Sequence, residues 1–348
     1  MRSLGMSRRN REVKCIAWDL DNTLWHGVLL EGGAARLRDG IRTLVRTLDE
    51  RGILMSIASR NDHDLAMRRL SQFGLDAYFL CPQITWGVKS GSLRAIAQNL
   101  NLGTDALAFI DDDPFERGEV AASLPEVLCI DAANLDAVAD MPEMNPRYIT
   151  VDARRRRSMY LAEMERQDLE VKLPPNEFLA SLGMVLTISE AEERDLARVE
   201  ELTMRTHQLN STGRTYSIAQ LGSFCRSEQH KLLLAGLDDR YGTYGKIGVA
   251  LVERTDEDWL VQLFLMSCRV MGRGVGNVFL GHILRSAKEE PVRVRAEFLR
   301  TERNRVMYLT FKLAGFREIE RSHDLAVLEH DLGSIDPVPD FLEVRVLA

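Results

Sequence analysis

Short apolar runs alternate with helical patterns between residues 13 and 130, and this alternation constrains the fold of that region more than any other feature. Runs such as CIAWDL and ILMSIAS are typical of buried strands, whereas IRTLVRTLDERG repeats its apolar residues with helical spacing. This rhythm predicts a parallel sheet that helices cover on both faces. Because ligands bind beyond the carboxyl ends of such strands, the polar residues found there are the first candidates for a site.

The same patterns predict individual elements along the whole chain. In the first half, strands are expected at 15–20, 53–59, 77–80, 106–110 and 127–130, and helices at 41–52, 62–74, 90–103 and 115–124. In the second half, strands are expected at 184–189, 231–237, 246–253, 259–268, 292–299 and 325–332, and helices at 192–209, 277–290 and 304–315. The runs at 231–237, 246–253 and 259–268 predict an antiparallel meander.

A proline-flanked, charged segment separates the two halves, and a length of 348 residues favours two domains. The fold class expected is α/β, with a parallel-sheet domain followed by a mixed α/β domain. We expect a flexible N-terminus at 1–12, the first domain at 13–145, a charged helical connector at 146–175 and the second domain at 176–348. Arg154 to Arg157 are interpreted as a solvated face of the connector helix, and a dedicated phosphate or partner site is the alternative.

Composition narrows the class of protein. The net charge of −7 argues against general affinity for nucleic acid. No apolar run approaches membrane-spanning length, and the basic N-terminus lacks the apolar run of a signal peptide, so we expect a cytoplasmic protein without a membrane partner. The five cysteines are scattered and have no metal-binding spacing, which predicts free thiols.

Polar residues follow successive predicted strands of the first domain in an order that suits phosphoryl transfer. Acidic groups gathered at a strand end are unfavourable unless a cation or phosphate organises them. An acidic loop end that only caps a helix is the alternative for any one of these residues. The candidates are Asp19, Asp21, Ser59, Lys89, Asp111 and Asp112.

These residue types predict separate roles. Asp19 would attack phosphorus to form an aspartyl-phosphate, and Asp21 would protonate the leaving oxygen and later activate water. Mg²⁺ prefers hard oxygen ligands, and the metal site is assigned to Asp19, Asp21, Asp111 and Asp112. Ser59 and Lys89 would bind the phosphoryl oxygens, and Asn61 is assigned to the same phosphate-binding group.

The first half resembles the haloacid dehalogenase superfamily. Its motif DLDNT contains Asp19 and Asp21, and Ser59, Lys89 and the pair Asp111-Asp112 match the later motifs in order. The resemblance implies a Rossmannoid domain and a Mg²⁺-dependent phosphatase. The short gaps between motifs leave no room for a large cap domain, so we expect an open site.

The second half contains a glycine-rich turn, Arg269-Val-Met-Gly272-Arg273-Gly274, which follows a predicted strand and opens a predicted helix. Such a turn lets backbone N–H groups approach a phosphate at a helix N-terminus. It resembles the pyrophosphate-binding turn of GCN5-related N-acetyltransferases. The resemblance assigns pantetheine binding to Arg269, Gly272, Arg273, Gly274, Gly276 and Asn304. Tyr308 would lie near the departing thiol, although an ordinary helix residue is the alternative.

Cys268 stands directly before that turn. A thiol beside two arginines at a helix N-terminus is expected to be stabilised as a thiolate, and hence to be a nucleophile. The alternative is a small apolar residue that finishes a strand. His207, in the polar segment THQLNSTGRTYS, is a candidate base for the thiol, with a surface or capping role as its alternative.

Strings across both halves resemble the FkbH-like proteins of polyketide biosynthesis, among them WDLDNTLWHGVLLEG, SIASRNDHD, QLNSTGRTYS and LMSCRVMGRGVG. That resemblance implies a glyceryl–acyl carrier protein synthase. A glyceryl unit from 1,3-bisphosphoglycerate, a phosphorylated three-carbon acyl donor, would form a thioester on Cys268 and lose its 3-phosphate at Asp19, Asp21 and Mg²⁺. It would then pass to the phosphopantetheine arm of an acyl carrier protein. The basic run Arg154 to Arg157 would help to dock this acidic partner.

Three alternatives stay open at this point. A simple phosphatase would use the second half as a lid, a CoA-dependent acyltransferase would use its phosphatase site only for binding, and a carrier-docking module would have no catalysis. The sequence leaves undetermined the exact donor, the order of the chemical steps, the carrier protein, the oligomeric state and whether the two sites share one cleft.

Overall fold

The computed structural model describes residues 12–31, 35–206 and 208–347. The chain divides into two compact units, Met1–Leu161 (unit 1) and Ala162–Ala348 (unit 2), so that the division falls within one helix, α7 (Arg156–Glu170). In the described part of the chain, no helix is both long and apolar enough to cross a membrane.

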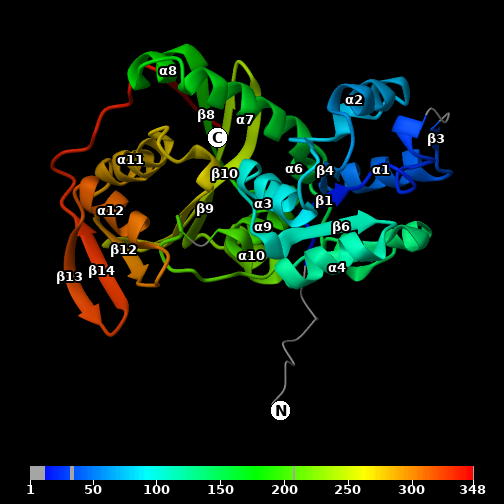
Figure 1. Ribbon diagram of the computed structural model, residues 1–348. Coiled ribbons are helices and arrows are strands. Elements are labelled where there is room, and N and C mark those ends of the chain that lie inside the picture. Colours follow the sequence, from blue (N-terminus) through cyan, green and yellow to red (C-terminus); the bar gives the residue numbers. More distant parts are fainter. Residues whose placement is uncertain (1–11, 32–34, 207, 348) are drawn as a thin grey trace. The chain divides into compact units, whose positions relative to one another are not determined.

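Unit 1 is built on a five-stranded parallel sheet in the order β5-β4-β1-β6-β7. Figure 1 labels β4, β1 and β6 of this sheet. Its strands are β1 (Cys15–Trp18), β4 (Leu54–Ser59), β5 (Gln83–Ile84), β6 (Leu107–Asp111) and β7 (Leu128–Asp131). The strands β1, β4 and β6 are buried along their whole length, as both-face coverage by helices requires. The helices of this unit are α1 (Ile41–Glu50), α2 (His63–Gln72), α3 (Lys89–Asn99), α4 (Pro114–Ser123), α5 (Leu135–Val138) and α6 (Val151–Arg154).

No domain is inserted between the described strands of this sheet. The connection from β1 to β4 holds a two-stranded antiparallel pair, β2 (Trp25–His26) with β3 (Arg36–Leu37), and then α1. The connection from β4 to α3 holds α2, a 3-10 turn and β5. A parallel-sheet unit without a large cap is therefore confirmed.

Unit 2 is built on an eight-stranded mixed sheet in the order β13-β14-β12-β11-β10-β9-β8-β15. Its strands are β8 (Met184–Glu190), β9 (His230–Asp239), β10 (Gly242–Arg254), β11 (Asp258–Met266), β12 (Arg293–Leu299), β13 (Arg317–Ser322), β14 (Leu325–His330) and β15 (Leu342–Val346). The helices after α7 are α8 (Pro175–Leu182), α9 (Leu196–Arg205), α10 (Ile218–Cys225), α11 (Val275–Lys288) and α12 (Arg305–Leu313). The predicted meander of β9, β10 and β11 is confirmed, and Figure 1 shows the β13–β14 hairpin at one edge of the sheet.

Apolar side chains cover both faces of this sheet. One core contains residues of α8, α11 and α12, and the other contains residues of α9 and α10. The parallel pairing of β11 with β12, joined by α11, is the one βαβ crossover between neighbouring described strands of unit 2. The expected mixed α/β domain is confirmed.

Several predicted elements differ from the structure. The strand expected at 77–80 is wrong, because this segment forms a 3-10 turn (Asp76–Tyr78) and a single bridge from Phe79 to Met55. The helix expected at 192–209 ends at Arg205, since the following residues extend and pair with strands instead. The strands β13 and β15 were not predicted. The β13 segment is largely exposed and lacks an apolar face, so its sequence has no strand pattern.

The charged connector is only partly solvated. Arg154 and Arg155 are exposed, as expected. Arg156 instead donates to the backbone oxygen of Gly52 (2.8 Å), and the Nε atom of Arg157 lies 2.8 Å from Asp49. The basic surface expected over four arginines is therefore reduced to two.

Gly52 provides a stability test of how α1 meets α6. Its φ is 73°, and a Cβ atom there would lie 2.6 Å from the backbone oxygen of Ala153. We predict that Gly52→Ala lowers the free energy of unfolding by about 2–4 kcal/mol, the sum of left-handed strain and overpacking. Gly74→Ala, at a φ of 65° with no atom within 4 Å, should cost only about 1–2 kcal/mol of strain. Urea denaturation followed by circular dichroism measures both, and equal losses would mean that α6 moves aside freely.

Candidate functional site

Three carboxylates converge at the carboxyl edge of the parallel sheet in unit 1. Asp19 directly follows β1, Asp111 ends the neighbouring strand β6, and Asp112 comes next. One oxygen from each lies within 4.8 Å of the others, close enough to bind a single ion. The sheet register explains this convergence, because Trp18 pairs with Ile110 and each aspartate follows its strand at the same level.

Lys89 compensates the charge of this carboxylate group. It begins α3, and its side chain is buried between two aspartates. Its Nζ atom donates to Asp19, to Asp111 at 3.0 Å and to the backbone oxygen of Ala58 at 2.8 Å. Without this ammonium, two buried carboxylates would repel each other in a region of low dielectric constant.

Burial changes the ionisation of these acids. Loss of hydration raises the pKa of Asp19 to about 7, against the attraction of Lys89, which lowers it. Burial likewise raises the pKa of Asp111. A bound cation would favour the charged forms of both groups.

The donor set fits Mg²⁺. Three carboxylates offer the hard oxygen ligands that this ion prefers, and two of them are nearly fully buried. The ligands expected from the sequence included Asp21, but its side chain lies outside this carboxylate group. The carboxylates placed to hold such an ion are therefore Asp19, Asp111 and Asp112.

Asp21 is instead held by three donors. Its carboxylate accepts from the Trp25 indole N–H (2.8 Å), the Leu29 backbone N–H (3.2 Å) and the Asn61 amide (3.0 Å). Burial raises its pKa, and these donors lower it. A half-buried carboxyl in a fixed orientation suits a proton donor better than a metal ligand. Asn61, expected to bind phosphate, acts here by orienting Asp21.

Ser59 remains the best phosphate-binding hydroxyl. Its side chain ends β4 and is buried next to the carboxylate group. It lies near enough to Asp19 to help lower the pKa of that carboxyl, yet no hydrogen bond of normal geometry reaches its Oγ atom from the described residues. A buried hydroxyl without a partner is costly, and a phosphoryl oxygen would supply one.

Two residues of this site were not predicted. Thr23 is fully buried, and its hydroxyl bonds the Asp112 carboxylate (3.1 Å) and backbone N–H (2.9 Å), which fixes that ligand. Trp25 holds Asp21 as described above. The only sequence signal for Thr23 was its place in DLDNT, and Trp25 has no signal because a buried tryptophan normally indicates core packing.

Cys268 lies in unit 2, in a 3-10 turn (Cys268–Val270) that follows β11, and it is exposed. The charged surroundings expected for it are only partly present. Arg269 is adjacent, and its Nε atom donates to the Ser267 hydroxyl (3.3 Å), while Arg273 is buried elsewhere. The structure thus places an accessible thiol near the carboxyl end of a strand, seven residues before α11 begins.

The glycine turn leads into α11 as expected. Gly272 and Gly274 have φ values of 80° and 74°, which favour glycine. Gly274 is the N-cap residue of the 14-residue helix α11 and has no side chain with which to cap its first turn. Unsatisfied N–H groups at a helix N-terminus attract anions, so these backbone groups and Gly276 can still bind a phosphate.

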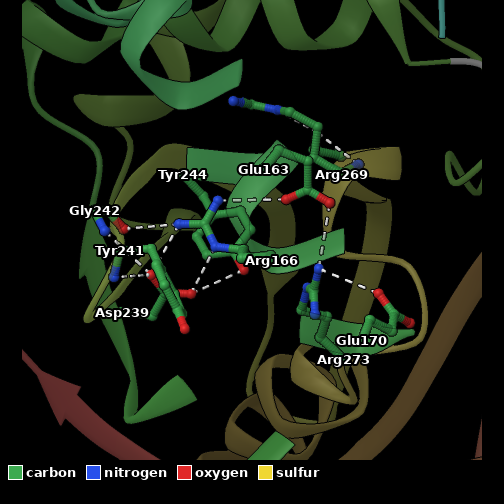
Figure 2. A network of polar contacts seen from close by, with 10 residues as sticks. Glu163, Arg166, Glu170, Asp239, Tyr241, Gly242, Tyr244, Arg269 and Arg273 are labelled. Carbon is green, nitrogen blue, oxygen red and sulfur yellow. Dashed lines mark hydrogen bonds and ion pairs between the residues drawn. The ribbon is translucent and has the colours of Figure 1, made fainter. Parts of the chain in front are cut away.

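Arg273 is not available to a ligand, which corrects the expectation. Its guanidinium is buried against Phe178 and pairs with Glu163 (3.3 Å) and Glu170 (3.9 Å), as Figure 2 shows. Both glutamates belong to α7. The part of α7 within unit 2 therefore neutralises this arginine.

Arg166 anchors the same part of α7 more firmly. Figure 2 shows its guanidinium between Asp239 and the ring of Tyr244. Two N–H groups donate to the Asp239 carboxylate at 2.8 Å each, and the ring centroid of Tyr244 lies 3.8 Å away. Both side chains of the ion pair are buried. No sequence pattern indicated this network, since charged helix residues normally face water.

Asn304 is also used inside the fold, contrary to its predicted pantetheine-binding role. Its side-chain oxygen accepts from the Thr301 backbone N–H (2.9 Å), and its amide donates to the backbone oxygens of Asn210 (3.1 Å) and Leu299 (2.8 Å). No ligand can use these atoms without breaking the loop between β12 and α12.

A short segment fills the gap where β11 and β12 separate. Ser211 donates its backbone N–H to Phe264 of β11 and accepts from Leu299 of β12, both at 2.9 Å. The segment Leu209–Thr212 is buried. His207, the candidate base, lies two residues before it but outside the described residues.

Tyr308 is half-buried on α12, and its hydroxyl donates to Glu318 at 3.1 Å. Burial and this carboxylate raise the pKa of Tyr308, so its proton is retained. This partner was not expected, because the predicted role placed the hydroxyl beside a thiol.

The comparisons with known proteins give partial similarity. No family model matches the sequence, and no curated protein matches it. The N-terminal part of protein BF1531 from Bacteroides fragilis, which contains a phosphatase domain complexed with Mg, is 26% identical with a TM-score of 0.32. That match covers 36% of this chain and spans 39% of that chain.

Other similar structures are acetyltransferases. The ribosomal-protein-S18-alanine N-acetyltransferase from Escherichia coli is 14% identical, with a TM-score of 0.34, and the match covers 44% of this chain and 97% of that chain. The putative acetyltransferase yncA from Salmonella typhimurium, with its cofactor acetyl-CoA, is 16% identical, with a TM-score of 0.32 and coverage of 44% and 98%. Matches with such low TM-scores show no function for this chain.

We predict that Mg²⁺ affinity depends on pH. Asp19 must lose its proton to bind a cation, and its pKa is raised to about 7 in the metal-free protein. The affinity should therefore rise about tenfold per pH unit below pH 7 and level off above it. Isothermal titration with MgCl₂ across this range measures the effect, and Asp19→Asn should abolish the slope. A constant affinity across neutral pH would mean that Asp19 is already ionised without metal.

We also predict that Arg166→Met destabilises unit 2 by about 3 kcal/mol, because it leaves Asp239 buried without its cation. The neighbouring Arg240 is exposed, and its guanidinium donates to the Tyr241 hydroxyl, so Arg240→Met should change stability by less than about 1 kcal/mol. Urea unfolding of both variants tests this, and similar midpoints would show that the buried pair contributes nothing.

Proposed function

We propose that this chain is a bifunctional enzyme that transfers a glyceryl unit from a phosphorylated acyl donor to an acyl carrier protein and removes a phosphate on the way. The observation that carries the proposal is the buried group of Asp19, Asp111, Asp112 and Lys89 beside the unpartnered hydroxyl of Ser59. This arrangement fits Mg²⁺-dependent phosphoryl transfer.

The residues of unit 1 divide this chemistry. Asp19 attacks phosphorus, and the departing oxygen takes a proton from Asp21, whose pKa is raised by burial. Water, activated by the same Asp21, then hydrolyses the aspartyl-phosphate. Lys89 and Ser59 bind the phosphoryl oxygens, and a bound Mg²⁺ would supply further positive charge to them.

The residues of unit 2 support acyl transfer through a thioester. The Cys268 thiolate attacks the carbonyl carbon of an acyl phosphate, the C–O bond to phosphate breaks, and phosphate leaves with the electron pair. The thiol of the carrier arm then displaces Cys268. The uncapped N-terminus of α11 can bind the phosphate of that arm. In unit 1, the exposed Arg154 and Arg155 offer a basic surface to an acidic carrier protein.

One observation favours a second candidate. Arg273 and Asn304, the side chains expected to bind pantetheine, are both engaged within the fold. If unit 2 binds no pantetheine arm, the chain is a Mg²⁺-dependent phosphatase that acts on a free metabolite.

We predict that the enzyme with Mg²⁺, 1,3-bisphosphoglycerate and holo-acyl carrier protein adds a glyceryl group to the carrier, detected by intact-protein mass spectrometry. Cys268→Ser should abolish this gain, whereas Cys225→Ser, at a half-buried thiol elsewhere in unit 2, should preserve it. Asp19→Asn should leave a phosphoglyceryl adduct.

The outcomes separate the two candidates. Phosphate release with an unmodified carrier, unaffected by Cys268→Ser, would replace the transferase with the phosphatase. Loss of 3-phosphate release in Asp19→Asn would support unit 1 in either case. Continued release of that phosphate, as distinct from the acyl phosphate displaced at Cys268, would contradict the site described above.

A further inference from the structure

A cavity of about 760 Å³ opens in unit 2 between the end of β12, the first turns of α12 and the β13–β14 hairpin. Its walls include Phe298, Arg300, Arg305, Tyr308 and Arg321. Cys268 is not among the residues that line it. The volume lies within the range of small-molecule sites and is too large for a single phosphate ion.

The charge of this cavity is unusual for the chain. Three guanidinium groups line it in a protein whose net charge is −7. Among the described residues, no carboxylate lies within ion-pair distance of Arg300 or Arg305. The carboxylates of Glu302 and Asp324 also line the cavity and offset part of this charge. Because a concave wall focuses the field of the unpaired arginines, the cavity selects an anion.

The base of the cavity is fixed. The rings of Phe298 and Tyr308 lie 5.0 Å apart, and the Tyr308 hydroxyl is tied to Glu318. Glu318 also accepts from Arg321 at 2.7 and 2.6 Å. Arg321 is therefore compensated, and Arg300 and Arg305 are left to meet a ligand. Guanidinium forks bind phosphate and carboxylate oxygens in pairs.

The cavity and the Cys268 thiol both lie at the carboxyl ends of neighbouring strands, β12 and β11. The strands β11 and β12 run parallel, and Ser211 bridges Phe264 of β11 to Leu299 of β12. Two strand spacings, or roughly 10 Å, therefore separate these strands at that level. Cys268 follows β11, and Arg300 follows β12 directly.

We propose that Arg300 and Arg305 form a binding site for the terminal phosphate of the three-carbon acyl donor. This inference rests on the proposed function for the identity of the donor. The ligand class is a phosphomonoester that also carries an acyl group. The arginines hold the phosphate that is not displaced, while the acyl carbon meets Cys268. No bond to the held phosphate forms or breaks in this step.

Binding of 3-phosphoglycerate, a stable relative of the donor, tests the site without any transfer. Isothermal titration is performed on the full chain carrying Asp19→Asn, with EDTA, so that unit 1 cannot turn the ligand over. We expect Arg300→Gln and Arg305→Gln each to weaken binding at least tenfold. Arg303→Gln is the matched control, because Arg303 is an exposed arginine of the same loop that does not line the cavity. Glycerate, which lacks the phosphate, should bind far more weakly than 3-phosphoglycerate.

Each outcome decides the proposal. Selective loss in the Arg300 and Arg305 variants supports it, and residual binding in unit 1 would be common to all variants. Equal binding in every variant, equal loss in Arg303→Gln, or no binding by the parent protein would overturn it. If the cavity binds 3-phosphoglycerate but the protein transfers no acyl group to a carrier protein, the binding site is supported and the proposed transferase function is contradicted.

Discussion

The Lys89 ammonium is the interaction on which unit 1 depends. It joins Asp19, Asp111 and a backbone oxygen at the carboxyl edge of the sheet, where two buried carboxylates would otherwise repel. A buried charge persists only when it is paired and hydrogen-bonded, and this lysine satisfies both aspartates at once. Lys89 therefore stabilises the aspartates at the carboxyl edge of the sheet before any cation binds. Burial raises the pKa of Asp19 and the attraction of Lys89 lowers it, so the two effects on this carboxyl oppose each other.

Unit 2 depends on pairing of a different kind. The part of α7 in this unit is fixed by Arg166 and Asp239, and its glutamates hold Arg273. Between β11 and β12, the segment Leu209–Thr212 supplies the backbone partners that the separating strands lack. Asn304 then ties that segment to the loop after β12. Polar residues that look like ligands in the sequence thus satisfy buried groups of the fold.

The sequence predicted the parallel sheet and the approach of Asp19 to Asp111, because strand periodicity and acidic strand ends are local signals that a parallel sheet brings together. It could not predict that Thr23 fixes Asp112 or that Asp21 turns toward Trp25 and Asn61, since side-chain direction within a loop depends on tertiary neighbours. The pairing of Arg273 with Glu163 could not be predicted for the same reason. A glycine-rich turn indicates its own backbone conformation, but its pairing with Glu163 depends on how a distant helix packs.

The structural roles of Arg273 and Asn304 limit which groups of unit 2 can perform chemistry. With Arg273 and Asn304 engaged in the fold, the groups still open to a ligand are the Cys268 thiol, the backbone N–H groups at the start of α11, and the arginines of the cavity beside Tyr308. A thiol, a helix N-terminus and an arginine pocket suit an acyl phosphate and a phosphorylated thiol better than a neutral amine. In the proposed function, the positive groups would bind charge at either end of such molecules, and the thiol would exchange the acyl group between them. Unit 2 would then serve acyl exchange between anions, whatever the order in which unit 1 would remove phosphate.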